Sequence, residues 1–540
     1  MTAVPSAHKL SIGTRFKPAR LAEHYDAIVI GSGMGGLTTA ALLSDLGQKV
    51  CVLEQHYTAG GYTHSYEREG YEWDVGVHYI GDVGRQTRTR KMFDHLSSGE
   101  LEWAPMADEY DRFYIGENTY SAVAGKQAFR DNLVAQFPEE EAAIDQYMGL
   151  LKQASGATYN NVMARVMKPW QRQLAAPLIK WRTPDLLYRT TYDVLRELTA
   201  NEDLIATLCG QWGDMGVPPK RSAFMVHAMI ARHYLYGGYY PVGGAWRIAK
   251  TIIPKIQAAG GEVFTFAHVE KIVVRDGRVV GVDMRSGHHI VCDNVISSAG
   301  IANTFEHLLD AEVVEKTGYA AKLPKVKPSF AHLGLYIGVK QTAEELGLPK
   351  TNFWIYPHND FDGAVEAFEQ DQNAPFPVVY ISFPSAKDPD YLNRFPGTAT
   401  IEVVAPAPYR WFRKWEDTTW GKRGEDYDAF KHRLGEKLMA YVYEKLPQLN
   451  NHVDYYEVST PLSTNWFSAY RQGELYGLDH TPERLKQDWL GPHTRIKGLW
   501  LTGQDTLTCG VTGAMMSGMM TATAMTGMRK IGPLLKQIWS

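Results

Sequence analysis

The hydrophobic pattern is clearest near the start of the chain, where a strand, a helix and a second strand follow one another. Apolar residues run through Tyr25–Ile30, recur at helical spacing over Leu37–Leu46, and run again over Lys49–Leu53. The run Gly31-Ser32-Gly33-Met34-Gly35-Gly36 joins the first strand to the helix, and Gly47 stands where a helix C-cap is expected. This order predicts a parallel βαβ unit with a glycine-rich first turn.

Each glycine of this turn has a distinct physical role in a dinucleotide-binding unit. Gly31 permits the tight turn, Gly33 lets a pyrophosphate approach the backbone, and Gly36 lets the helix pack closely on the sheet. The helix N-terminus offers free N–H groups and the positive end of its dipole to phosphates. Glu54, 23 residues after Gly31, stands where a carboxylate can accept ribose hydroxyls. Together these features predict dinucleotide binding, although the glycine motif alone could also be an ordinary glycine-rich loop.

The segment after Glu54 and Gln55 favours FAD over a nicotinamide cofactor. Ala59-Gly60-Gly61 begins only five residues after Glu54, too early for an ordinary crossover helix. The glycine pair predicts a second close approach of the backbone to the same cofactor, and a plain surface turn is the alternative. No second G-x-G-x-x-G follows a strand, so a separate NAD(P) domain is not predicted.

Later parts of the chain alternate between nucleotide-domain patterns and inserted segments. A helix over Ala245–Ala258 and a run of short strands recur before residue 310, with Asp276-Gly277 as a hairpin signal. The remaining strand predictions include Ser329–Val339, Val378–Phe383, Thr398–Val404 and Leu499–Thr502. We predict an α/β fold with an FAD-binding Rossmann-type domain built from discontinuous segments and an α+β substrate domain. The predicted divisions are an N-terminal extension (1–24), FAD-binding segments (25–100, 241–310 and 485–540) and substrate-domain segments (101–240 and 311–484).

The last segment adds cofactor-binding candidates. Asp505 could bind a ribityl hydroxyl or orient a pyrophosphate, and a helix starting near Gly513 would direct its positive end at the flavin and stabilise its reduced anion. Residues 506–528 carry no charge but are rich in Gly, Thr and Ser, so a buried helix is preferred over a membrane span. Gly503 and Val269 complete the predicted cofactor-binding set.

Composition limits the function classes. The chain has 540 residues, enough for two or three domains, and its net charge of −4 gives no case for nucleic-acid binding. The four cysteines form no C-x-x-C pair, which argues against a disulfide framework or a structural zinc site. With 14 Trp, 30 Tyr and 19 Phe, a large apolar pocket or an aromatic-rich core is expected.

Residues 161–200 interleave basic and aromatic side chains in a helical pattern broken by Pro169, Pro177 and Pro184. Such a segment can lie on a membrane surface and receive a lipid-soluble substrate. A solvated helical face is the alternative. We expect a cytoplasmic protein. Peripheral contact with a membrane surface is one interpretation of this segment.

Several motifs resemble the phytoene desaturase and carotenoid isomerase superfamily of flavoproteins, and within it the retinol saturase branch. They spread over nearly the whole chain, and they are Leu53-Glu54-Gln55-His56, Asp74-Val75-Gly76-Val77-His78-Tyr79-Ile80-Gly81, Gln136-Phe137-Pro138, His233-Tyr234-Leu235-Tyr236-Gly237-Gly238 and Leu501-Thr502-Gly503-Gln504-Asp505. Eukaryotic retinol saturases begin with an apolar membrane-targeting segment, whereas residues 1–24 here are polar.

The resemblance implies non-covalent FAD and a lipophilic conjugated polyene, either a retinoid or a carotenoid. Hydride from reduced flavin would reach one carbon of a C=C bond, and an acid or water would protonate its neighbour. His78 and Tyr79 are the predicted catalytic residues, with His64, His233 and Tyr236 as second choices, and a satisfied core residue is the alternative for each. Isomerisation, desaturation and a non-catalytic prenyl-lipid carrier of the Rab escort type remain open. The external electron donor or acceptor is not identified.

Overall fold

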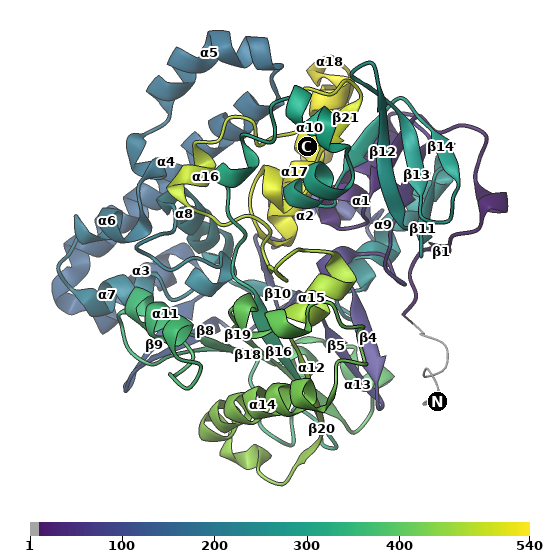
Figure 1. Cartoon of the computed structure of the whole chain (residues 1–540). Helices are drawn as coiled ribbons and strands as arrows, with labels where there is room; N and C mark the ends of the chain where they lie inside the picture. The colour runs from purple at the N-terminus through teal and green to yellow at the C-terminus, as the bar shows by residue number, and fades with distance from the viewer. Residues whose placement is uncertain (1–9) are drawn as a thin grey trace.

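The computed structural model describes residues 10–540, apart from the side chains at positions 155, 159, 161, 180 and 182. Two large sheets dominate the molecule, and Figure 1 shows helix α17 (Gly510–Thr526) near its centre, with the second sheet below it. The other α-helices are α1 (Met34–Asp45), α2 (Arg88–Leu96), α3 (Lys126–Gln136), α4 (Glu141–Val166), α5 (Pro169–Arg182), α6 (Thr191–Arg196), α7 (Glu202–Leu208), α8 (Phe224–Tyr234), α9 (Arg247–Ala258), α10 (Ala311–Lys316), α11 (Phe361–Gln370), α12 (Pro384–Lys387), α13 (Tyr391–Arg394), α14 (Glu425–Lys445), α15 (Pro461–Ser468), α16 (Pro482–Leu485) and α18 (Met528–Trp539).

The first sheet is parallel and collects strands from distant parts of the sequence. Its order is β1 (Thr14–Arg15), β11 (Glu262–Thr265), β3 (Val50–Leu53), β2 (Ala27–Ile30), β15 (Val295–Ser297) and β21 (Leu499–Leu501). Apart from the polar and partly exposed edge strand β1, the strands are short, largely apolar and mostly buried, as expected for a parallel sheet covered on both faces. The predicted Rossmann-type fold built from discontinuous segments is confirmed.

The N-terminal extension is only partly what the sequence predicts. Thr14 and Arg15 pair in parallel with Phe264 and Thr265, and the side chains of Leu10 and Ile12 are buried. The prediction that residues 1–24 form a loose extension is therefore wrong for this part, because its extended backbone completes the edge of the sheet. Residues 1–9 lie outside the described residues.

The second large sheet is mixed and belongs to the predicted α+β part. Its order is β20 (Val453–Ser459), β16 (His332–Val339), β19 (Ala399–Pro406), β18 (Val379–Ser382), β17 (Asn352–Tyr356), β8 (Glu109–Ile115) and β9 (Asn118–Val123). Every pair is antiparallel except β17 and β8. Strands β17 and β20 are not among those predicted from the sequence.

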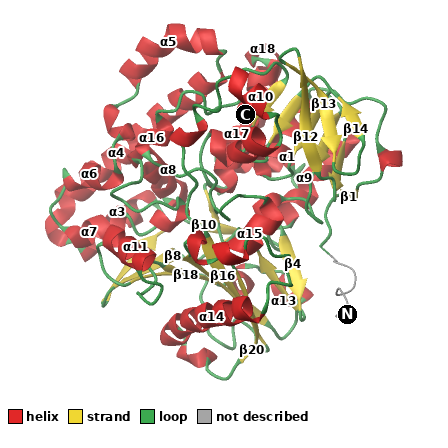
Figure 2. Cartoon of the chain, viewed as in Figure 1, coloured by secondary structure: helices red, strands yellow, loops and turns green. Residues whose placement is uncertain are grey.

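Three smaller sheets complete the fold, and Figure 2 shows one of them at the upper right, formed by β12 (Val269–Arg275), β13 (Arg278–Met284) and β14 (His289–Val291). Asp276 and Gly277 both have positive φ between β12 and β13, which confirms the predicted tight hairpin turn. The other two are β6 (Ile80–Gly81), β10 (Gly238–Pro241) and β7 (Trp103–Pro105), and the pair β4 (Ser65–Arg68) and β5 (Tyr71–Asp74).

Helix α1 lies against its neighbours backbone to backbone. A Cβ at Gly36 would lie 2.2 Å from the carbonyl oxygen of Gly31, and one at Gly35 would lie 2.6 Å from the backbone nitrogen of Gly503. A Cβ at Gly518 of α17 would lie 2.7 Å from the carbonyl oxygen of Gly35. These contacts require glycine, because real Cβ atoms do not approach other atoms so closely.

The uncharged segment near the C-terminus forms α17, which packs on α1 and buries most of its central residues. The preferred interpretation as a buried helix is confirmed, although the helix begins at Gly510 rather than near Gly513. Within residues 10–540, we find no helix that has both the length and the apolar character needed to cross a bilayer.

We expect Gly36→Ala to lower the free energy of unfolding by roughly 3 kcal/mol, because the added methyl group meets a carbonyl that cannot move independently of the sheet. The exposed helical Gly149 is a matched control, since a Cβ there meets nothing within 4 Å. Gly149→Ala should raise stability by about 0.5–1 kcal/mol. Urea denaturation of both variants measures the effect, and equal stabilities would contradict the proposed packing constraint.

Candidate active site

A cavity of about 1710 Å³ lies where the two large sheets face each other. One end is lined by the glycine-rich turn after β2, and the other by side chains of the mixed sheet. Most of the predicted site residues border it: Gly31, Gly33, Glu54, Gln55, Gly60, Gly61, His78, Val269 and Gly503. Segments separated by several hundred residues thus meet around one space.

The Glu54 carboxylate organises the turn that faces this cavity. One oxygen accepts hydrogen bonds from the Ser32 N–H at 2.9 Å and the Ser32 hydroxyl at 2.7 Å, and the other accepts from the His56 N–H at 2.8 Å. The Ser32 hydroxyl oxygen also accepts from the Gly60 N–H at 3.0 Å. A carboxylate has about four acceptor positions, so Glu54 keeps capacity for a further hydroxyl donor.

The turn has the features of a dinucleotide site. A Cβ at Gly33 would meet no atom within 4 Å, so this position opens onto the cavity, and Gly31 has a φ of +94° that other residues rarely adopt. Helices α1 and α17 both begin at the cavity without a side-chain cap or an acid in their first turns. Both therefore offer free N–H groups to an anionic or electron-rich ligand.

Four predicted site residues do not border the cavity. Gly36 packs against the Gly31 carbonyl, and Gly513 lies within α17, where a Cβ would be 2.6 Å from the Thr508 carbonyl oxygen. The two carboxylate oxygens of buried Asp505 accept the N–H groups of Ile301 and Leu478, at 2.8 and 2.9 Å. Tyr79, the fourth, is buried behind the wall and stacks on Tyr234 at 4.2 Å between ring centroids. A direct cofactor contact of Asp505 therefore stays a prediction.

The second-choice residues lie in different environments. His64 borders the cavity, and its Nδ1 lies 2.7 Å from the Gly61 carbonyl oxygen. Its pKa falls to about 3, mainly because of burial. The His233 Nε2 accepts the Gly81 N–H at 2.8 Å, while Tyr236 is 54% exposed. Neither of the last two residues lines the cavity.

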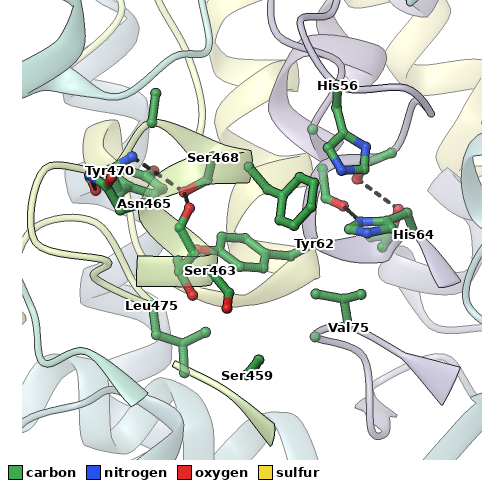
Figure 3. Close-up of a pocket in the computed structure, with 18 of the residues that line it drawn as sticks. His56, Tyr62, His64, Val75, Ser459, Ser463, Asn465, Ser468, Tyr470 and Leu475 are labelled. Atoms are coloured by element: carbon green, nitrogen blue, oxygen red, sulfur yellow. Dashed lines mark hydrogen bonds between the residues drawn. The ribbon is translucent and has the colours of Figure 1, made fainter. Parts of the chain in front are cut away.

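Aromatic and small polar side chains form the wall on either side of Tyr62. Figure 3 shows its ring between His56, His64 and Val75 on one side and Ser463 and Ser468 of α15 on the other. The rings of His56 and His64 lie 4.7 Å apart, and the Tyr62 hydroxyl donates to the Glu474 carbonyl oxygen at 3.3 Å.

The register of the mixed sheet places an apolar row beside a polar row on the face toward the cavity. Val404 pairs with Tyr380, which pairs with Trp354, and these three side chains border the cavity. Two residues along the same strands, and so on the same face, lie Glu402, Ser382 and Asn352. Asp111 pairs with Asn352 and extends the polar row across β8.

His78 lies over the polar row and pairs with Glu402. The His78 Nδ1 is 2.8 Å from one Glu402 oxygen, and the other oxygen accepts the Asp74 N–H at 2.7 Å. Burial raises the pKa of Glu402 to about 8 and lowers the pKa of His78 to about 3. Both pKa shifts favour the uncharged forms of Glu402 and His78, in which the Glu402 carboxyl group donates its hydrogen to the His78 Nδ1.

Lys387 is the basic residue of this cluster and is almost completely buried. Its Nζ donates to the Ser382 hydroxyl at 2.8 Å, to the His78 carbonyl oxygen at 3.0 Å, and to the Asn352 side-chain oxygen. Burial lowers the pKa of Lys387 to about 7. The nearby carboxyl groups of Glu402, Asp111 and Asp74 have the opposite, smaller effect. The sequence analysis did not identify Lys387, Glu402 or Asp111, although an acid inside the predicted apolar strand Thr398–Val404 was a usable signal.

Asp214 is a further residue of the cavity wall that the sequence did not predict. It lies in a short 3-10 helix, Trp212–Asp214, and borders the cavity. The Tyr79 hydroxyl lies 3.2 Å from an Asp214 carboxyl oxygen and 3.0 Å from an Asp111 oxygen. No periodicity or motif in the sequence points to this residue.

Comparison with known proteins agrees with this geometry. A family model described as an NAD(P)-binding Rossmann-like domain matches residues 29–96. Human all-trans-retinol 13,14-reductase is 36% identical, covering 96% of this chain and 88% of its own. Prolycopene isomerase 1, chloroplastic, of an Oncidium hybrid cultivar is 26% identical and covers 95% and 86%. The structure of cyclohexylamine oxidase from Brevibacterium oxydans IH-35A superposes with a TM-score of 0.58 at 14% identity, covering 94% of this chain and 99% of that one.

The Rossmann-type sheet and the glycine turn with Glu54 define a dinucleotide-binding domain, and the relatives define the class, an oxidoreductase. The extent and level of identity to the human protein then identify the family. The chain belongs to the all-trans-retinol 13,14-reductase family.

The raised pKa of Glu402 makes stability depend on pH. An unfolded glutamate has a pKa of about 4.3, so the stabilisation from the folded-state proton is complete below that pH and is lost as the pH rises through about 8. Glu402→Gln keeps an acceptor for the Asp74 N–H and offers an amide N–H to His78. We expect its free energy of unfolding, relative to wild type, to rise by about 1 kcal/mol or more from about pH 5 to about pH 9.

Urea denaturation of wild type and Glu402→Gln at the two pH values measures how the difference in their free energies of unfolding changes with pH. The exposed Glu139→Gln variant is the control, because it removes the same formal charge away from the cluster and should give a pH-independent offset. A Glu402→Gln difference that is also independent of pH would show that Glu402 is ionised in the folded protein.

Proposed function

We propose that this protein binds FAD and reduces a C=C bond of a lipophilic conjugated polyene, a retinoid or a carotenoid. The observation that carries the proposal is the single cavity that joins the glycine turn to the apolar row of the mixed sheet. The family relationship supports it, since the relatives include a retinol reductase and a prolycopene isomerase.

The residues at the glycine end fit FAD. Gly31, Gly33 and the N-terminus of α1 would hold the pyrophosphate, Glu54 would accept ribose hydroxyls, and Gly60-Gly61 gives a second uncovered stretch of backbone. The N-terminus of α17 would stabilise negative charge on the pyrimidine edge of the isoalloxazine ring. When bound in its reduced form, FAD supplies the hydride.

The residues at the other end suit an extended apolar substrate. Val404, Tyr380, Trp354 and Phe330 present apolar and aromatic surface to the cavity, with His78 at their margin. The pKa of His78 is lowered by burial, so its ring carries no charge at neutral pH and can touch a polyene without an ion being desolvated. These side chains bind and orient the substrate and exclude water from the reacting carbons.

We expect the purified protein to take up FAD and, after anaerobic reduction, to add two hydrogens to a polyene. All-trans-retinol, a linear carotene and an unsaturated fatty acid are the substrates to compare, with products measured by mass spectrometry. An unchanged mass with a new geometric isomer would identify an isomerase, which the prolycopene isomerase relative makes the second candidate. Loss of two hydrogens would identify a desaturase. A colourless protein that takes up no FAD would instead favour a lipid carrier.

Helix α5 supports a further part of the proposal, contact with a membrane surface. Its exposed apolar side chains Trp170, Leu174, Leu178 and Trp181 recur at spacings of three and four, so they form one stripe. Trp181 is 79% and Leu174 76% exposed, and Figure 1 shows α5 at the outer edge of the molecule. Residues 166–184 contain four basic residues and no acid. This combination fits insertion into an anionic lipid interface, from which an apolar substrate could enter.

We expect the protein to bind phosphatidylcholine vesicles more strongly when they contain phosphatidylserine. Replacing Trp170, Leu174 and Trp181 together by Gln should weaken binding about 100-fold or more, because each buried side chain contributes on the order of 1.5 kcal/mol or more. Leu392→Gln, which removes an exposed apolar side chain elsewhere, is the control. Vesicle co-sedimentation measures the effect. Equal binding of the triple variant and wild type would leave α5 as a solvated helical face.

A further inference from the structure

The Tyr79 hydroxyl has more partners than its single hydrogen can serve. Its oxygen lies 3.0 Å from Oδ2 of Asp111, 3.2 Å from Oδ2 of Asp214 and 3.3 Å from Nε2 of Gln211. A phenol donates one hydrogen bond and accepts through its oxygen. Gln211 Nε2 also donates to Asp111 Oδ2 at 2.7 Å, which fixes the orientation of its amide, since the reversed amide would place two oxygens together.

Two ionised carboxylates and one tyrosine contain a single hydrogen for the two contacts between the hydroxyl and the carboxyl groups, so one more proton is required. Gln211 donates to the Tyr79 oxygen, and Tyr79 donates its hydrogen to one of the two carboxyl groups. The other carboxyl would then face the hydroxyl oxygen with no hydrogen between them. Two oxygens at about 3 Å are stable only if one carries a hydrogen, so one of Asp111 and Asp214 is protonated.

The contacts favour Asp214 over Asp111 as the protonated group. Asp111 accepts two amide N–H groups, from Asn352 at 2.9 Å and from Gln211, which stabilise its charged form. Among the described residues, the side chain of Asp214 has one hydrogen-bond partner, Tyr79. Burial raises the pKa of both carboxyl groups. Hydrogen bonds from Asn352, Tyr79 and Gln211 oppose the rise at Asp111, whereas the neighbouring Asp111 charge adds to the rise at Asp214, whose pKa lies well above its usual range.

Asp214 also lies beside the place where the reaction is expected. Asp214 borders the cavity, as do Trp354 and Tyr380. A Cβ on the neighbouring Gly213 would lie 2.6 Å from the Trp354 ring, and the Asp214 charge contributes to raising the pKa of Tyr380. The Asp214 carbonyl oxygen accepts a hydrogen bond from the thiol of Cys509, the N-cap of α17, at 3.2 Å. His480 ties the same two segments, since its Nε2 accepts the Cys509 N–H and its Nδ1 lies 3.1 Å from the Met215 carbonyl oxygen.

We propose that Asp214 is the catalytic acid of this enzyme and that Tyr79 and Asp111 are positioning residues that keep it protonated. The inference rests on the proposed function. Reduction of C=C consumes a hydride, from the reduced flavin, and a proton. The hydride forms one C–H bond, the π electron pair moves to the neighbouring carbon, and the Asp214 O–H bond breaks as that pair forms the second C–H bond. Flavin is oxidised, the alkene is reduced, and the Asp214 carboxylate regains a proton from water.

The first test reads the protonation state without any cofactor. Infrared difference spectra of flavin-free, full-length wild type against Asp214→Asn should show the carbonyl stretch of a protonated carboxyl at neutral pH. In Asp111→Asn this band should titrate at a lower pH, because the neighbouring charge is gone and Tyr79 can donate its hydrogen to Asp214. A spectrum with only carboxylate bands assigned to Asp214 would overturn the proposal.

The second test reads turnover. Asp214→Asn should retain FAD binding but lose about 100-fold or more in product formation, the usual range for a general acid. Asp214→Glu keeps an acid and should retain both the infrared band and measurable turnover, so that a folding defect cannot imitate the result. His78→Gln should lose less than Asp214→Asn. Asp362→Asn is the matched control, since it removes a buried carboxyl of raised pKa that does not border the cavity.

The failures are distinguishable. A wild-type protein that reduces no polyene overturns the proposed function and the donor role together. An Asp214→Asn variant with wild-type turnover overturns the donor role alone, even when the infrared band is present. In deuterated water the wild-type product should carry deuterium at the carbon next to the one that receives hydride, because an Asp214 O–H exchanges with solvent, and absence of a label at that carbon would also overturn the donor role.

Discussion

Direct backbone contact between α1, β2 and α17 is the constraint on which the cofactor end of the molecule depends. Gly36 lets α1 rest on the Gly31 carbonyl that follows β2, and Gly35 lets α1 approach the backbone at Gly503. Gly518 lets α17 approach the Gly35 carbonyl of α1, so a side chain there would separate the two helices. Their close approach brings two uncapped N-termini to the same cavity, one beside the glycine turn and the other beside Asp214. The same glycines therefore determine both how the helices pack and where their N-termini lie, although glycine itself contributes no functional group.

The mixed sheet meets a different constraint, the cost of burying polar groups. Its polar row would be strongly destabilising if its members were ionised and unpaired. Instead Lys387 has three oxygen acceptors, Glu402 has donors or acceptors at both oxygens, and Asp111 accepts from two amides. The pKa values of Glu402 and Lys387 both shift toward their neutral forms. Because its polar groups are hydrogen-bonded and its titratable groups shift toward their neutral forms, the cluster can stay buried beside an apolar row.

The sequence predicts the parts of the fold that depend on local pattern. The βαβ unit, the hairpin at Asp276-Gly277 and α17 each have their signal within about thirty residues, and the structure contains all three. Strand β17 escapes prediction because it is five residues long and pairs with β8, more than two hundred residues away. Asp214 escapes for a related reason. It lies in a turn without periodicity, and its role comes from contacts with Tyr79 and Cys509, which are distant in sequence.

The part of the cavity wall around Val404, Tyr380 and Trp354 has titratable groups that favour their neutral forms, and this suits an uncharged substrate. A polyene that displaces water from the wall would leave any ionised side chain there desolvated, at a cost of several kcal/mol per ion. His78 is neutral, Glu402 behind it is neutral, and a protonated Asp214 would be neutral as well. Asp111 lies one layer behind the cavity wall, where hydrogen bonds from two amides favour its charged form against the effect of burial, which raises its pKa. The arrangement keeps an acid available at the wall while the surface that a polyene would contact remains uncharged.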